Sequence, residues 1–294
     1  MRSQDFFRLY EQGYRDFKGI DLSGADLSSH ILVDVNLTGA NLSGANLSRA
    51  FLTKAIFTGA TLDRANLKFA KLSASNFVTA SLIKANLQGA FGVRANFTRA
   101  SLTGGQLSYI NFRAAKLIDA NLSSTNLTGA NLRNAELTRA NFAWANLTGA
   151  RMVGSAIALA RFPGATLESA QLNGLNFSRM QLDNINFKAA KLKGTQFKHA
   201  NLTAANFEGA SLQNSDFSGA QLVGAILAQA NLHKARFTNA NLNRIETAAV
   251  DWANADLTGT CLFRQFFNRD PTHNLAARPH HPVGFERPLE AYSS

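Results

Sequence analysis

Apolar residues recur at every fifth position of this 294-residue chain, from residue 17 to residue 262. Leu or Phe fills 45 of these 50 central positions, Ala stands two places before the centre in 33 units, and Asn stands one place before it in 19. A period of five fits neither the 3.6 residues of a helical turn nor the alternation of a flat strand. The pattern therefore predicts short extended segments joined by turns, wound into coils that hydrogen-bond to one another about 4.8 Å apart. Because one unit cannot bury its Leu alone, we expect neighbouring coils to stabilise each other.

Tandem units of this kind, such as Ala-Asn-Leu-Thr-Gly at residues 145–149, resemble the pentapeptide-repeat family. The resemblance covers residues 15–264. It implies an all-β fold, a right-handed quadrilateral β-helix (a solenoid) of about 12 coils with four pentapeptides in each, and so about 20 residues per coil.

A few units depart from the pattern. Gly92 and Thr247 occupy central positions, and large residues replace the small one in three successive units, at Leu175, Met180 and Ile185. We expect the last three to lie at adjacent corners of one coil. They either swell that coil locally or mark a kink made by a partner.

The two ends of the chain differ from the repeats. Residues 1–14 are expected to form an N-terminal cap, with one short helix over residues 3–12 that begins at Ser3 and is stopped by Gly13. Residues 265–294 are expected to form a C-terminal cap and a proline-rich tail. An uncapped β-helix end is an open edge, so association through an end of the helix is an alternative.

The chain is basic, with a net charge of +11. If a coil takes 20 residues, the units centred on Leu32, Leu52, Leu72 and their counterparts form one side of the helix, which we call the basic face. Only Asp34 and Asp251 oppose its cations. Its nine cations are Lys54, Lys71, Arg94, Arg113, Arg133, Arg151, Lys191, Lys193 and Lys234. We expect the four arginines to project in a line from consecutive coils, and Phe51 and Phe91 to lie outward on the same face.

No catalytic constellation is visible in the sequence. The six His are scattered, and no glycine-rich phosphate loop follows a strand-like run. Asp119 and Glu136 are expected on one face, but Arg99 and Arg139 flank them, so a neutralised surface ladder explains the pair better than acid–base chemistry. We therefore expect no enzyme activity, no cofactor and no metal site.

The basic face favours a scaffold that binds a protein partner, which we expect to be acidic. Binding of a polyanion or nucleic acid is the alternative, although two Phe give little support for base stacking. The charge is also compatible with a role in solubility alone. Some members of the family that this chain resembles inhibit DNA gyrase by imitating DNA, but that imitation requires an acidic surface, and this chain has the opposite sign.

The sequence also bears on location. It has no apolar run of about 18 residues, so we expect no membrane span. Its first twenty residues lack the layout of a secretory signal, and its single Cys cannot form an internal disulfide. We expect a cytoplasmic, bacterial protein.

Overall fold

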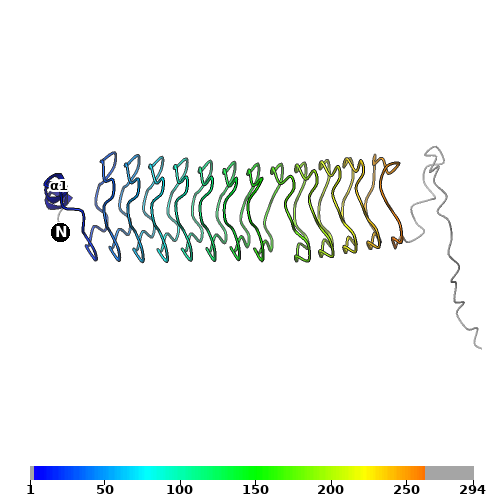
Figure 1. The fold of residues 1–294 in the computed structure, drawn as a ribbon, viewed down its shortest axis with the longest axis horizontal. Coiled ribbons are helices and arrows are strands. Elements are labelled where there is room, and N and C mark those ends of the chain that lie inside the picture. Colours follow the sequence, from blue (N-terminus) through cyan, green and yellow to red (C-terminus); the bar gives the residue numbers. More distant parts are fainter. Residues whose placement is uncertain (1–2, 262–294) are drawn as a thin grey trace, which may run out of the picture. The chain divides into compact units, whose positions relative to one another are not determined.

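A computed structural model describes residues 3–261, and within them the pentapeptides follow one repeated backbone path (Figure 1). In most units the residue before the central Leu or Phe forms a parallel bridge with the residue 20 places further on, as between Asn126 and Asn146. Four pentapeptides therefore complete one coil, and successive coils stack as a β-helix. Residues that occupy the same position in successive coils, 20 apart, form what we call a column.

The corner between two units is a turn with a left-handed residue. The N–H of Ala40 donates to the carbonyl of Leu37 over 3.0 Å, and Gly39 before it has a φ of 64°. Such a turn favours Gly or Asn because a Cβ is strained at positive φ. The same position nevertheless holds Arg94, with a φ of 58°. Repeated packing of coils thus imposes this conformation on residues that would not choose it.

The preference for Asn before the central residue has a structural cause that the sequence pattern does not show. The Asn36 Oδ1 atom accepts a hydrogen bond from the N–H of Thr38 over 3.1 Å, which closes a small turn within the unit. Between coils, the Asn66 side chain donates to Asn46 Oδ1 over 3.0 Å. One Asn can therefore support both the turn and the column.

The central residues stack inside the helix. The rings of Phe57, Phe77 and Phe97 lie one above another, with centroids 4.6 and 4.5 Å apart. At Gly92, where the central side chain is missing, the Phe112 ring of the next coil fills the space, since a Cβ built on Gly92 would lie 2.7 Å from Phe112 Cε1. The core therefore stays closed at this departure from the repeat.

The short helix expected at residues 3–12 is present as α1 (Ser3–Glu11). Phe6 is fully buried and its ring packs edge-on against Phe17, 4.6 Å away. The Tyr10 hydroxyl donates to the carbonyl of Val33 over 2.9 Å. Helix α1 thus covers the first coil. The expected C-terminal cap and tail at 265–294 lie outside the described residues, and the domain limits stay predictions.

Within residues 3–261 the ladder between coils lacks two adjacent bridges at one level of the stack, and one further bridge, from Asn231 to Asp251, is missing near the end. Bridges join Glu136 to Ala156 and Asn176 to Gln196, but none joins Ala156 to Asn176 within residues 3–261. The bridge from Arg161 to residue 181 on the next face is missing as well. Figure 1 shows a wider gap between the ribbons here, in the green part of the chain.

The large corner residues lie on the C-terminal side of this opening. Leu175 and Ile185 are buried and Met180 is partly buried. Their coil pairs normally with the following one, for example through the N–H of Asn201 and the carbonyl of Met180, 3.0 Å apart. A single large corner residue does not open the ladder, because Ile110 is buried with its carbonyl hydrogen bond intact. We attribute the opening to three large corners in one coil, which hold the preceding coil away.

Candidate protein-interaction face

The structure places the residues of the basic face at outward positions on one side of the β-helix. Phe51, Lys71 and Phe91 are consecutive members of one column, joined by parallel bridges between neighbours. Arg151 and Lys191 continue the same column further along the chain, on either side of Gln171. These five side chains therefore share one column, and their role in partner binding stays a prediction.

The four arginines do not form the single line that we expected. The equivalents of Arg94 in the following coils are Ala114 and Asn134, whereas Arg113 and Arg133 occupy a neighbouring column. Arg151 lies in a third column. The period of five assigns each residue to a face. The position of the residue within its pentapeptide then decides its column, and this position differs among these arginines.

The remaining cations of the face fall into the same columns. Lys193 shares the column of Arg113 and Arg133. Lys54 and Lys234 share the column of Arg94, and all three are exposed at turn positions with φ between 58° and 60°. The face thus carries its charge in three parallel columns.

Ion pairs lie elsewhere on the described part of the chain. Salt bridges join Lys18 to Asp16, Arg139 to Asp119, Lys188 to Glu208 and Lys198 to Asp216, and in α1 Arg8 to Asp5. Within residues 3–261, no cation of the basic face forms a salt bridge. The Arg151 Nε atom is, moreover, buried without a hydrogen-bond partner. The basic face therefore keeps its positive charge uncompensated.

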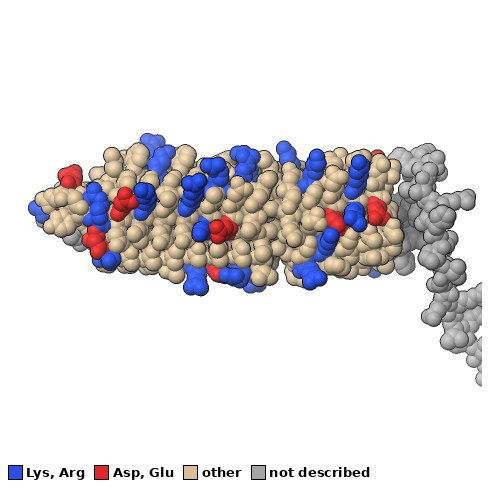
Figure 2. All heavy atoms as spheres, in the orientation of Figure 1, with Lys and Arg blue, Asp and Glu red and all other residues tan. Residues whose placement is uncertain are grey.

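The face that contains Asp119 and Asp216 behaves differently. Both side-chain oxygens of Asp119 accept hydrogen bonds from Arg139, at 2.6 and 2.7 Å, and this contact lowers the pKa of the Asp119 carboxyl. The pairing agrees with the expected neutralised ladder. Figure 2 shows one side of the molecule on which several acidic side chains lie directly beside basic ones.

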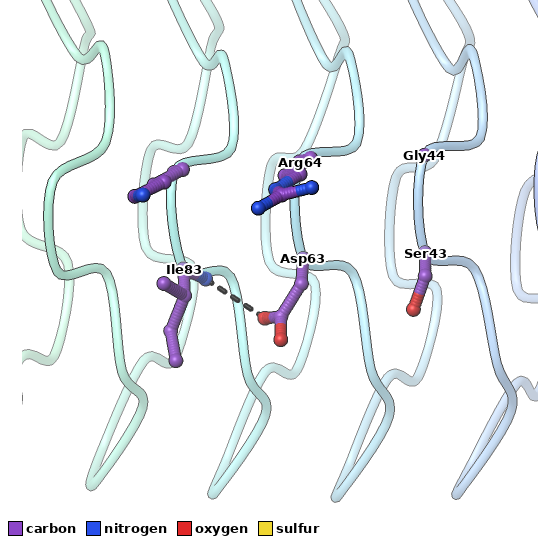
Figure 3. A pocket seen from close by; sticks show the side chains of 6 residues that line it. Ser43, Gly44, Asp63, Arg64 and Ile83 are labelled. Atoms are coloured by element: carbon purple, nitrogen blue, oxygen red, sulfur yellow. Dashed lines mark hydrogen bonds between the residues drawn. The ribbon is translucent and has the colours of Figure 1, made fainter.

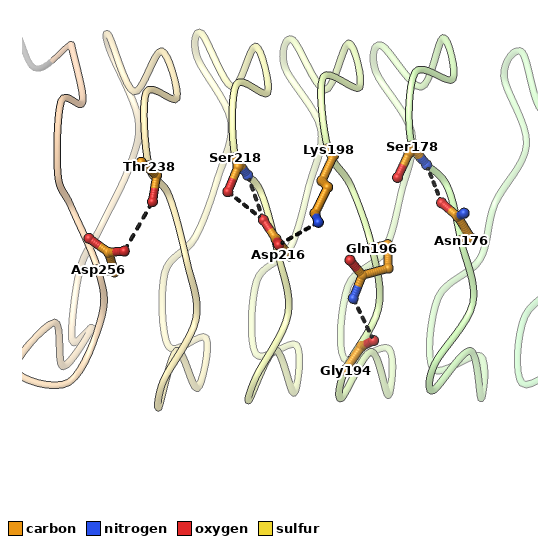
Figure 4. Close-up of polar contacts among 9 residues, drawn as sticks. All are labelled: Asn176, Ser178, Gly194, Gln196, Lys198, Asp216, Ser218, Thr238 and Asp256. Carbon is orange, nitrogen blue, oxygen red and sulfur yellow. Dashed lines mark hydrogen bonds and ion pairs between the residues drawn. The ribbon is translucent and has the colours of Figure 1, made fainter.

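Asp216 is the one carboxylate among the buried side chains of the described residues. Burial alone raises its pKa, but hydrogen bonds from the Ser218 hydroxyl and N–H, and from Lys198, outweigh burial and lower it (Figure 4). Two coils further on, Asp256 accepts a hydrogen bond from Thr238 over 3.0 Å. These acids are held by local donors and are not arranged around a common substrate site.

A small open hollow lies away from the basic face, lined by Ser43, Gly44, Asp63, Arg64, Ile83 and Lys84 (Figure 3). The Asp63 carboxylate already accepts hydrogen bonds from the N–H of Ile83, over 2.9 Å, and from Ser81. Arg64 and Lys84 stand in one column beside it. The sequence analysis did not predict this hollow. The sequence feature that could have indicated it is Gly44, a small residue that precedes the long side chains of Arg64 and Lys84 in the same column.

Residues 3–261 contain no group of three or more His, Cys, Asp or Glu placed to hold a metal ion. No helix in that part of the chain has the length and apolar character needed to cross a membrane.

Two family models match the sequence. The model described as pentapeptide repeats matches in eight copies, with ranges that include residues 20–59, 40–77, 60–91, 80–117, 95–134 and 115–154. The model described as a pentapeptide repeat region matches residues 160–227. No curated protein matches this chain.

Solved structures of pentapeptide repeat proteins are similar to this chain. HetL, involved in heterocyst differentiation regulation in Nostoc sp. strain PCC 7120, is 27% identical over 89% of this chain and 97% of its own, with a TM-score of 0.28. A protein from the Arabidopsis thaliana thylakoid lumen is 34% identical over 32% of this chain and 66% of its own, with a TM-score of 0.31. QnrB1, a plasmid-mediated fluoroquinolone resistance protein, is 18% identical over 85% of this chain and 94% of its own, with a TM-score of 0.41.

Proposed function

This chain belongs to the pentapeptide-repeat family, and on that premise we propose that it is a non-enzymatic cytoplasmic scaffold that binds an acidic protein through its basic face. The scaffold is a right-handed quadrilateral β-helix of about 12 coils. One observation carries the proposal: nine cations share a face with two acids, and none of the nine forms a salt bridge within residues 3–261.

The uncompensated charge is costly to the isolated protein. Arg113 and Arg133 occupy equivalent positions in adjacent coils, about 4.8 Å apart along the column. Like charges directly opposite each other on neighbouring strands are destabilising. Carboxylates of a partner, placed between the guanidinium groups, would relieve this repulsion, and the positive field would steer an acidic partner to the face.

Charge pairing on the other sides supports a specific role for the face. Arg139 and Lys198, for example, are matched with Asp119 and Asp216. If the net charge served solubility alone, it would not need to be collected on one side. A non-catalytic role is supported by the satisfied carboxylates described above, which leave no free acid–base pair in the described hollow.

The experiment compares two sets of four substitutions. In the face variant, Arg94, Arg113, Arg133 and Arg151 are replaced by Gln; in the control, Arg64, Lys84, Arg161 and Lys188 are replaced by Gln. Each protein is used to capture partners from lysate of the source cells, with and without nuclease, and the captured partner is then purified. Thermal melting verifies that both variants are folded.

The face variant is expected to lose most of the capture and to bind the purified partner with a flatter dependence on salt concentration. The control variant is expected to bind as the wild type does. Equal loss in both variants would show that the face provides only solubility. Loss of capture after nuclease treatment would show a nucleic-acid partner instead of an acidic protein.

A further inference from the structure

A column with three exposed apolar residues lies at the N-terminal end of the basic face. Ile31 is 65% exposed, Phe51 45% and Phe91 41%, and they share one column with Lys71 between the two rings. Large apolar side chains exposed together in a row, on a face that also carries charge, are typical of an interaction site.

Two exposed aromatic residues on other faces lie over a glycine of the next coil, whereas the rings of this column do not. Tyr109 lies over Gly129 of the next coil and Trp144 lies over Gly164, so closely that a Cβ on either glycine would clash with the ring. These rings replace the missing side chain of a neighbour. Phe51 and Phe91 have no glycine above them, because Lys71 and Asn111 occupy those positions.

Lys71 holds Phe91 in place. Its Nζ atom lies 3.6 Å from the centroid of the Phe91 ring, which is the geometry of a cation–π contact. This contact orients the ring before a partner arrives and so lowers the entropy lost on binding. Apolar rings beside cations that form no salt bridge within residues 3–261 favour a protein ligand that carries both apolar side chains and carboxylates.

Cations accompany the rings at a fixed spacing. Lys54 follows Phe51 by three residues and Arg94 follows Phe91 by three residues, and both cations are exposed. The same pair of a ring and a cation is thus presented twice, two coils or about 9.6 Å apart. A partner that fits this surface must offer a row of apolar side chains beside a row of carboxylates, both parallel to the helix axis.

Helix α1 borders the column. The Phe7 ring stacks on His30, 3.8 Å away, next to Ile31 in the chain. The hydrogen bond from Tyr10 to Val33 fixes the other side of the same unit. Ile31 stays exposed between these contacts, so α1 bounds the column without covering it.

We infer that Ile31, Phe51 and Phe91 are the apolar anchor of the interface, and that they receive large apolar side chains from an acidic segment of the protein partner. This inference rests on the proposed function and names the chemistry of its partner. A few buried aromatic residues contribute most of the binding energy in typical interfaces, and the charges around them contribute mainly to the association rate.

The test replaces Phe51 and Phe91 by Ser and, in a matched control, Tyr109 and Trp144 by Ser. Affinity for the purified partner is measured from low to high salt, next to the face variant described above. The anchor variant is expected to bind about tenfold more weakly or worse. This factor is expected to be the same at every salt concentration, because the removed rings carry no charge. The control is expected to stay within about twofold of the wild type.

The outcomes separate this inference from the proposed function. If the anchor variant binds like the control while the face variant is weak, the anchor is wrong and the proposed function stands. If only the anchor variant is weak, the rings bind the partner without help from charge, and both the proposed function and the acidic segment inferred here are overturned. If both variants bind like the wild type, or if capture depends on nucleic acid, both are overturned.

Discussion

At the level of single residues, Leu147 and Thr148 are neighbours in the chain but lie on opposite sides of the coil wall. Leu147 is fully buried in its column, whereas Thr148 is half-exposed and donates its N–H to Asn146 Oδ1 over 3.0 Å. The same substitution at the two positions therefore tests whether the inward register is right.

Leu147→Asp is expected to prevent folding or to lower the thermal midpoint strongly, because it buries a carboxylate with no partner. Thr148→Asp is expected to change the midpoint little, because the new charge is solvated. Thermal unfolding followed by circular dichroism measures both. Equal damage from the two substitutions would contradict the assignment.

Gly92 and Phe112 occupy the same position in adjacent coils, and the large ring of Phe112 fills the space that Gly92 leaves. Phe112→Leu restores the consensus residue but leaves the space over Gly92 empty, so we expect a loss of about 1–2 kcal/mol in the free energy of unfolding. Gly92→Leu alone is expected to cost about 1–3 kcal/mol, because the new side chain meets the ring. The double variant is expected to recover most of both losses.

Denaturant unfolding of the four proteins gives the coupling between the two sites. If the two single losses simply add in the double variant, Phe112 does not compensate for Gly92.

The lowered pKa of Asp216 makes stability depend on pH. Above the ordinary carboxyl pKa, the group is charged in both states, and its bonds to Ser218 and Lys198 stabilise the folded state. As the pH falls through the lower folded pKa, the carboxylate takes up a proton and this stabilisation is lost. Asp216→Asn is therefore expected to lose less stability than the wild type on acidification from pH 7 to about pH 3.

The measurement is the urea midpoint as a function of pH. Asp183→Asn, at an exposed carboxylate, serves as the control. Parallel curves for the wild type and Asp216→Asn would show that Asp216 does not contribute.

At the level of the coil, the opening before Asn176 removes hydrogen bonds that join neighbouring coils elsewhere. The N–H groups of Ile157 and Phe162 form none of the inter-coil hydrogen bonds that Leu137 and Phe142 form one coil earlier. Unpaired amides exchange their hydrogens more readily than amides in a closed ladder.

Replacing Leu175, Met180 and Ile185 together by Ala is expected to let the coils approach and to increase the protection of the amides of Ile157 and Phe162 about tenfold or more. Hydrogen exchange read by mass spectrometry measures this change. Ile110→Ala is the control, because that corner lies in a closed ladder. A triple variant that is less stable and no better protected would show cavity formation without closure.

At the level of the whole described stack, each coil interacts only with its neighbours, so a weak interface divides the molecule into segments that unfold separately. The chain has two Trp, and they lie on opposite sides of the opening: Trp144 packs over Gly164, and Trp252 lies 5.5 Å from the Phe237 ring. Single-Trp variants, made with Trp144→Phe or Trp252→Phe, are expected to show two different urea midpoints by fluorescence. Coincident midpoints would mean that the opening does not interrupt cooperativity.

How much of this was accessible from sequence depends on the distance that a feature spans along the chain. An unbroken period of five determined which residues face inward, as the burial of Leu147 shows, and it collected the nine cations on one side once the coil length was known. That length came from resemblance to a family, because a pentapeptide pattern alone does not state how many units close a coil.

Tertiary structure decided every feature that joins residues about 20 apart. It placed Lys71 over Phe91, set Phe112 above Gly92, divided the arginines into columns and opened the ladder before Leu175. The physical reason is that a unit's own sequence determines its turn and its inward residue, whereas a contact between coils depends on what the neighbouring coil presents at the same position. The pattern of apolar and polar residues therefore predicts the turn and the inward residue of each unit, but it does not predict the contacts between coils.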